Sequence, residues 1–138
     1  MRDWSKIKYF RANEFNQPEK MDWWLICMLD ILREYAKSPI IIHSSYREGD
    51  NGTHGRGKAV DLHIVGLSVI DQFLLAEKTR LFSGIGIYPF WNNPGLHLDV
   101  RELKGDEIGK RWAKNAAGEY VALDAKFILS IKCGNILW

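Results

Sequence analysis

The chain has 138 residues, of which 46% are hydrophobic and 26% charged, and its formal net charge is +2. This length and composition are typical of one domain that buries a sizeable core without disulfide support, so we expect residues 1–138 to form a single domain. Because Lys and Arg are spread among Asp and Glu, the charge pattern gives no reason to expect nucleic acid as a partner.

Targeting and redox signals are weak. Residues 1–15 interleave charged and apolar side chains and lack the continuous apolar stretch of a signal peptide, so we expect synthesis in the cytoplasm. No apolar run approaches the roughly 20 residues that span a bilayer, so no membrane insertion is expected. Cys27 and Cys133 do not have zinc-ligand spacing and are expected to be buried free thiols.

The first predicted element is a helix from Met21 to Tyr35, where apolar residues recur every three or four positions. Asn16 and Pro18 are placed to begin this helix, and Ser38-Pro39 ends it. The apolar stripe, which should face the core, consists of Met21, Trp24, Leu25, Met28, Leu32 and Tyr35.

Strands are expected on both sides of a polar loop. The β-branched run at residues 40–46 predicts a buried strand that ends just before Arg47, and residues 48–58 are rich in turn formers. Residues 59–65 alternate as a strand, with Asp61 and His63 on one face and apolar residues on the other.

The second half of the chain carries shorter elements. Ser68 is an N-cap candidate for a second amphipathic helix that extends to Phe82. Two short strands at residues 84–88 and 96–100 flank a turn, and residues 122–131 favour a short helix. The residues expected to bury the second helix are Ile70, Phe73, Leu74 and Leu81.

One window imitates a phosphate-binding loop. Residues 52–58 read GTHGRGK, which fits the G-x-x-x-x-G-K pattern. A true phosphate loop has Ser or Thr next and opens a helix, whereas here Ala59 follows and the chain enters a predicted strand. We therefore do not expect nucleotide binding.

A metal site is the stronger hypothesis for the same region. His54 lies in the loop, Asp61 on the following strand and His97 on a later strand. Two histidines and one carboxylate form a ligand set of catalytic zinc, which leaves one position open for reaction. Spacing alone also allows these residues, like His43 and His63, to be hydrogen-bonded structural groups.

Five short words appear in order: SSYRE at 44–48, T-H-x-x-G-x-A-x-D at 53–61, GIGIYP at 84–89, LHLDVR at 96–101, and Arg111-Trp112. In these words the sequence resembles the M15 zinc peptidases, the D-alanyl-D-alanine carboxypeptidase-like group with the Hedgehog/DD-peptidase fold. The resemblance covers roughly residues 21–112. It implies an α+β fold with a small, mostly antiparallel central sheet and flanking helices.

The resemblance also implies residue roles. His54, Asp61 and His97 would be ligands of Zn²⁺, and Arg47 would bind substrate or stabilise its developing oxyanion. The implied substrate is a peptidoglycan stem peptide, cleaved next to a D-amino acid. Many relatives are phage or prophage enzymes that a holin or a tail delivers to the cell wall.

The sequence departs from the family pattern at one position. Several members carry Glu or Asp three residues before the last histidine ligand as general base, but this position is Pro94. Asp99 is therefore the candidate base, since it shares a strand face with His97. An equal alternative is that Asp99 orients a ligand or Arg101.

Two other classes of function stay open. The chain would then be a non-catalytic zinc-containing module that binds cell wall or a protein partner, or a phage structural protein with a relic of the site. The sequence does not distinguish carboxypeptidase, dipeptidase and endopeptidase activity, and it does not define the oligomeric state.

Overall fold

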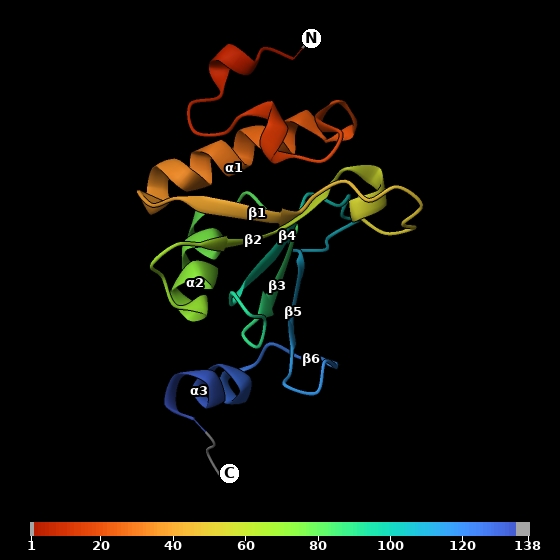
Figure 1. Ribbon diagram of the computed structural model, residues 1–138. Coiled ribbons are helices and arrows are strands. Elements are labelled where there is room, and N and C mark those ends of the chain that lie inside the picture. The colour runs from red at the N-terminus through yellow and green to blue at the C-terminus, as the bar shows by residue number, and fades with distance from the viewer. Residues whose placement is uncertain (1, 135–138) are drawn as a thin grey trace.

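The computed structural model describes residues 2–134, which form a six-stranded mixed sheet and three α-helices (Figure 1). The α-helices are α1 (Trp23–Ala36), α2 (Val69–Thr79) and α3 (Ala125–Cys133). The strands are β1 (Ile40–Ser44), β2 (Ala59–Ile64), β3 (Gly84–Tyr88), β4 (Gly95–Asp99), β5 (Lys110–Lys114) and β6 (Tyr120–Val121). Short 3₁₀ helices occur at Trp4–Lys6, Ala12–Glu14, Pro18–Lys20 and His54–Arg56. The predicted α+β class is confirmed.

The sheet has the strand order β1-β2-β4-β3-β5-β6. β3 and β5 run parallel, and the other neighbouring pairs run antiparallel. The four strands predicted from the sequence lie at the centre and at the β1 edge. β5 and β6 were missed, because the sequence KRWAK of β5 has only one fully buried side chain and reads as a polar segment.

The start of α1 differs from the prediction. Asp22, and neither Asn16 nor Pro18, caps this helix, and its carboxylate accepts a hydrogen bond from the backbone N–H of Leu25 at 3.2 Å. Pro18 instead begins a separate 3₁₀ turn. The N-terminal segment then packs against α1, where Trp4 meets Trp23 edge to face with ring centroids 5.3 Å apart.

The buried face of α1 is rotated from the predicted stripe. Trp24 is 70% exposed and Tyr35 is 65% exposed, so their assignment to the core was wrong. Adjacent residues point about 100° apart around a helix, so a rotation of α1 by this angle buries the residues next in sequence to those predicted. The residues of α1 that are buried are Leu25, Ile26, Leu29 and Leu32. In α2, likewise, Leu74 is exposed and Gln72 is buried.

One face of the sheet packs against the helices and the other carries polar groups. Alternation along β2, β3, β4 and β5 sends side chains of these strands into a single core shared with α1 and α2. These inward-facing residues are Val60, Leu62, Ile64, Ile85, Ile87, Leu96, Leu98 and Ala113. The intervening residues, including Asp61 and His97, therefore lie together on the opposite face.

Two smaller expectations have different outcomes. Cys27 is half-buried and Cys133 is exposed, so both thiols are free but neither is fully buried as predicted. Among residues 2–134, none of the helices has the combined length and apolar character needed to cross a membrane.

The rotated face of α1 can be tested with two adjacent residues. Leu25→Ala should lower the free energy of unfolding by about 2 to 5 kcal/mol, because it removes a fully buried side chain. Trp24→Ala should change it by less than about 1 kcal/mol, because that side chain lies mostly in water. Urea denaturation measures both values. Equal losses in the two variants would contradict the orientation of the helix.

Candidate metal centre

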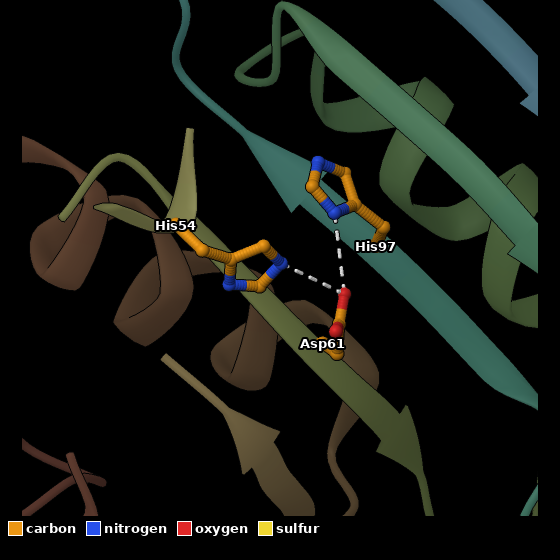
Figure 2. Close-up of side chains that lie close together, drawn as sticks. All are labelled: His54, Asp61 and His97. Atoms are coloured by element: carbon orange, nitrogen blue, oxygen red, sulfur yellow. Dashed lines mark hydrogen bonds and ion pairs between the residues drawn. The ribbon is translucent and has the colours of Figure 1, made fainter. Parts of the chain in front are cut away.

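The strand register places the predicted ligands side by side on the polar face of the sheet. Asp61 of β2 lies opposite His97 of β4, and the same row continues through Gly86 of β3 to Trp112 of β5. His54 reaches this point from the 3₁₀ turn before β2. Figure 2 shows the three side chains converging from these separate segments.

The distances between the ligand atoms fit a bound first-row metal ion such as zinc. His54 Nε2 lies 3.3 Å, and His97 Nδ1 3.2 Å, from the same oxygen of Asp61, Oδ1. Zinc holds such ligands at about 2.1 Å, so two of them at a tetrahedral angle stand roughly 3.4 Å apart. All three residues are buried. The group can therefore hold a metal ion.

The charge state of Asp61 suits a ligand. Burial acts to raise the pKa of this carboxyl, but the hydrogen bonds and positive charges that His54 and His97 supply when their rings are protonated outweigh burial and hold the pKa well below its usual range. The carboxylate is therefore ionised at neutral pH and available to a cation.

A backbone carbonyl determines which nitrogen of His54 is available. Its Nδ1 lies 2.9 Å from the carbonyl oxygen of Ser45, and because a carbonyl only accepts, Nδ1 carries the proton. In the neutral imidazole, Nε2 then directs a lone pair at Asp61 Oδ1. A cation between the two atoms removes this repulsion, and an outer carbonyl partner is typical of a metal-binding histidine.

Two carboxylates hold His97 from opposite sides of its ring. Nδ1 faces Asp61, and Nε2 lies 2.7 Å from Asp99 Oδ2. Burial acts to lower the pKa of His97, but these two carboxylates outweigh burial and raise it above its ordinary value. Metal binding at Nδ1 would therefore displace a proton and leave Nε2–H donating to Asp99.

Asp99 lies sealed beneath the site. Its side chain is fully buried, and Arg101 donates to it from Nη2 at 2.6 Å and from Nε at 3.0 Å. Burial acts to raise the pKa of Asp99, but the hydrogen bonds from His97 and Arg101 hold it well below its usual range. Of the two roles that the sequence leaves open, this geometry favours orientation of His97, because the carboxylate has no exposed side.

Arg47 lies just beyond β1 and reaches over the ligand carboxylate. Its Nη2 donates to Asp61 Oδ2 at 2.9 Å, and its Nε donates to Ser44 Oγ at 2.9 Å. Nη1 lies 3.4 Å from Asp50 Oδ2. The side chain is 46% exposed, so a guanidinium group is held at the rim of the site with part of its surface open to a ligand.

Two glycines of β3 make room for the groups around His97. A Cβ atom at Gly86 would lie 2.5 Å from Nε1 of Trp112, and one at Gly84 would lie 2.3 Å from Oδ2 of Asp99. The indole therefore lies across β3, with its ring centroid 5.1 Å from that of His97. The G-x-G spacing of this strand is explained by the side chains of its two neighbours.

The site opens into a cavity of about 620 Å³. The aromatic side chains of Tyr88, Trp91 and Trp112 line it. Sequence reasoning missed Lys114 and Tyr120 because it missed their strands. Alternation along β5 would have placed Lys114 on the same face as Trp112. A larger hollow of about 700 Å³ lies near α3 and contains none of the three ligands.

The other two histidines form a separate pair. His43 Nε2 lies 2.6 Å from His63 Nδ1, and the two rings stack with centroids 4.8 Å apart. His43 is exposed, so its predicted place in the core was wrong. That place was predicted by taking the whole apolar run as buried, whereas β1 is an edge strand in which Ile40 is buried and both Ile41 and His43 are exposed.

No protein-family model, curated protein or solved structure matches this chain. His54, Asp61 and His97 form a buried group that could hold a metal ion, with an ordered partner on the second ring nitrogen of each histidine and a cavity beside the group.

The orienting role of Asp99 predicts a graded loss of metal. Asp99→Asn should weaken zinc affinity about 10-fold to 100-fold, because it removes the charge that steadies His97, whereas His97→Ala should abolish stoichiometric binding. Competition with a chromogenic chelator measures both affinities. Asp106→Asn, an exposed neighbouring change, is the matched control. An unchanged affinity in Asp99→Asn would rule out the orienting role.

Proposed function

We propose that this protein is a zinc metallopeptidase that hydrolyses peptide bonds in peptidoglycan stem peptides next to a D-amino acid. The observation that carries the proposal is the buried convergence of His54, Asp61 and His97 beside an open cavity. The substrate class and the Hedgehog/DD-peptidase fold rest on the resemblance of the five sequence words to M15 zinc peptidases. The α+β architecture is compatible with that fold.

The residues divide the chemistry among them. When bound, zinc acts as a Lewis acid and lowers the pKa of a coordinated water to about 7. Arg47 is placed to donate to the scissile carbonyl oxygen, since its guanidinium lies against the ligand Asp61 and is still half exposed. Trp112 forms part of the cavity wall next to His97 and excludes water from that side.

The proton acceptor is best assigned to Asp50. Apart from the ligand Asp61, it is the carboxylate found in the cavity lining among residues 2–134. Its Oδ1 accepts from the backbone N–H of Gly52 at 2.6 Å, while Oδ2 faces Arg47. The side chain of Asp50 is 28% exposed, in contrast to the fully buried carboxylate of Asp99.

The two carboxylates can be separated by assays at saturating zinc. Asp50→Asn keeps the acceptor for Gly52 and should lose about 100-fold or more in hydrolysis of purified cell walls, because proton transfer is removed. Asp99→Asn should recover most of its activity once zinc is saturating. The reverse pattern would return the base to Asp99 and overturn the assignment of Asp50.

Removal of Arg47 tests the stabilisation of the oxyanion. Arg47→Ala should lower kcat about 100-fold to 1000-fold and still bind about one zinc per chain, because the guanidinium contacts the ligand carboxylate but does not belong to the ligand set. Arg47→Lys should recover only part of the loss, since an ammonium lacks the paired donors. Full activity in Arg47→Ala would refute this role.

The buried state of Asp99 favours one alternative, a non-catalytic zinc-containing module that binds cell wall or a protein partner. In that case the parent protein would retain zinc and bind cell walls, but purified walls would show no loss of turbidity and release no peptide. Retention of zinc together with released stem-peptide fragments would decide for the peptidase.

A further inference from the structure

The wall of the cavity formed by β5 and β6 carries a positive charge that the site does not use. Arg47 pairs with Asp50 and Asp61, and Arg101 pairs with the buried Asp99. Lys114, which also lines the cavity, forms no ion pair with a carboxylate within residues 2–134. Its ammonium instead lies 4.9 Å from the ring centroid of Tyr120.

The register gives this lysine a defined place beside the ligands. Gly86 lies between His97 and Trp112 in one row, and Lys114 follows Trp112 by two residues on the same strand face. Lys114 itself pairs with Tyr120 of β6. The Lys114 side chain therefore lines the cavity two residues beyond Trp112 along β5.

Two tyrosines, Tyr88 and Tyr120, line the cavity together with Lys114. Tyr88 is buried, and its hydroxyl oxygen accepts a hydrogen bond from Trp112 Nε1–H at 2.9 Å, so the O–H of Tyr88 acts as a donor on the cavity side, next to Tyr120. Tyr120 is 68% exposed and lines the cavity. One half-buried ammonium and two phenol groups form a set of donors that suits an anion.

We propose that Lys114, with Tyr88 and Tyr120, binds a carboxylate of the substrate close to the cleaved bond. That the ligand is a peptide rests on the proposed function, whereas the preference for a carboxylate rests on the cavity wall alone. Peptidase activity would then favour substrates in which a carboxylate lies close to the bond.

The spacing of the strands limits how close that carboxylate is. Neighbouring strands lie about 4.8 Å apart, so β5 lies about 10 Å from β4, which carries His97, and Lys114 lies a further two residues, about 7 Å, along β5 from the row of His97. An extended peptide covers about 3.5 Å per residue, and the lysine side chain reaches back over part of the gap. The carboxylate is therefore within one or two residues of the bond, and a C-terminal carboxylate at this distance would be that of a carboxypeptidase or a dipeptide-releasing enzyme.

Three small peptides distinguish the possible sources of this carboxylate. Acetyl-D-alanyl-D-alanine carries it at the C-terminus, the C-terminal amide of the same peptide lacks it, and an acetylated D-glutamic acid peptide with an amidated C-terminus carries it on a side chain. NMR titration of the zinc-loaded protein gives the dissociation constant of each peptide. The same spectra show whether the peptide is hydrolysed, in which case KM from initial rates replaces the dissociation constant.

The parent should bind one of the two carboxylate peptides about 10-fold or more tightly than the amide, as expected for a charged hydrogen bond. Which of the two is preferred identifies the source. Lys114→Gln should remove the preference, and Lys114→Arg should keep most of it. Lys110→Gln, on the same strand but outside the cavity lining, should bind like the parent. Matching thermal midpoints of Lys114→Gln and Lys110→Gln would show that folding is intact.

The outcomes separate the two proposals. A carboxylate preference that depends on Lys114, without hydrolysis of peptides or cell walls, would refute the peptidase and support the binding subsite. Hydrolysis with equal affinity for acid and amide, or a preference that survives in Lys114→Gln, would overturn the subsite alone. Neither binding nor hydrolysis would overturn both.

Discussion

The structure around the site depends on one buried carboxylate. Asp61 lies in the middle of a sheet whose opposite face is apolar, and it is approached by His54, His97 and Arg47 at 3.3, 3.2 and 2.9 Å. An ionised carboxylate in such a place is costly unless positive or donating groups surround it. A metal ion on Oδ1 and the guanidinium on Oδ2 would satisfy both oxygens. These contacts require three segments to be positioned together: the loop that carries His54, β4 with His97, and the end of β1 with Arg47.

The hydrophobic core on the other face of the sheet fixes the positions of these strands. Because side chains alternate along a strand, the packing of Leu62 and Leu98 against the helices fixes which way Asp61 and His97 point. A shift of the strand register by one residue would exchange apolar and polar groups between the two faces, and several side chains that are now buried would become exposed to water. The burial of apolar side chains that stabilises the fold therefore also orients Asp61 and His97.

The sequence predicted the parts of this arrangement that depend on period and order. Alternation located β2, and the residue types of His54, Asp61 and His97 suggested a metal site, although their spacing alone also allowed structural histidines. It could not give the rotation of α1, since apolar residues occur all around that helix and tertiary packing chooses the buried face. It also missed β5 and β6, and with them Lys114, because their side chains face a polar cavity and a short edge. The partner of His54, the carbonyl oxygen of Ser45, is a backbone group and leaves no residue-type signal.

Pro94 has a structural role in the turn before β4. Its carbonyl oxygen accepts from Nε2 of the buried Gln72 at 3.0 Å, and Gln72 Oε1 accepts from the N–H of Ile64 at 3.0 Å, so α2 ties the turn before β4 to the end of β2. This segment borders the hollow near α3 and is not part of the cavity lining next to the ligands. In the proposed peptidase, a carboxylate for proton transfer would then come from another wall of the cavity. Asp50 would supply it from the loop that precedes His54, so the proposed base and a proposed ligand would lie on one short segment of chain.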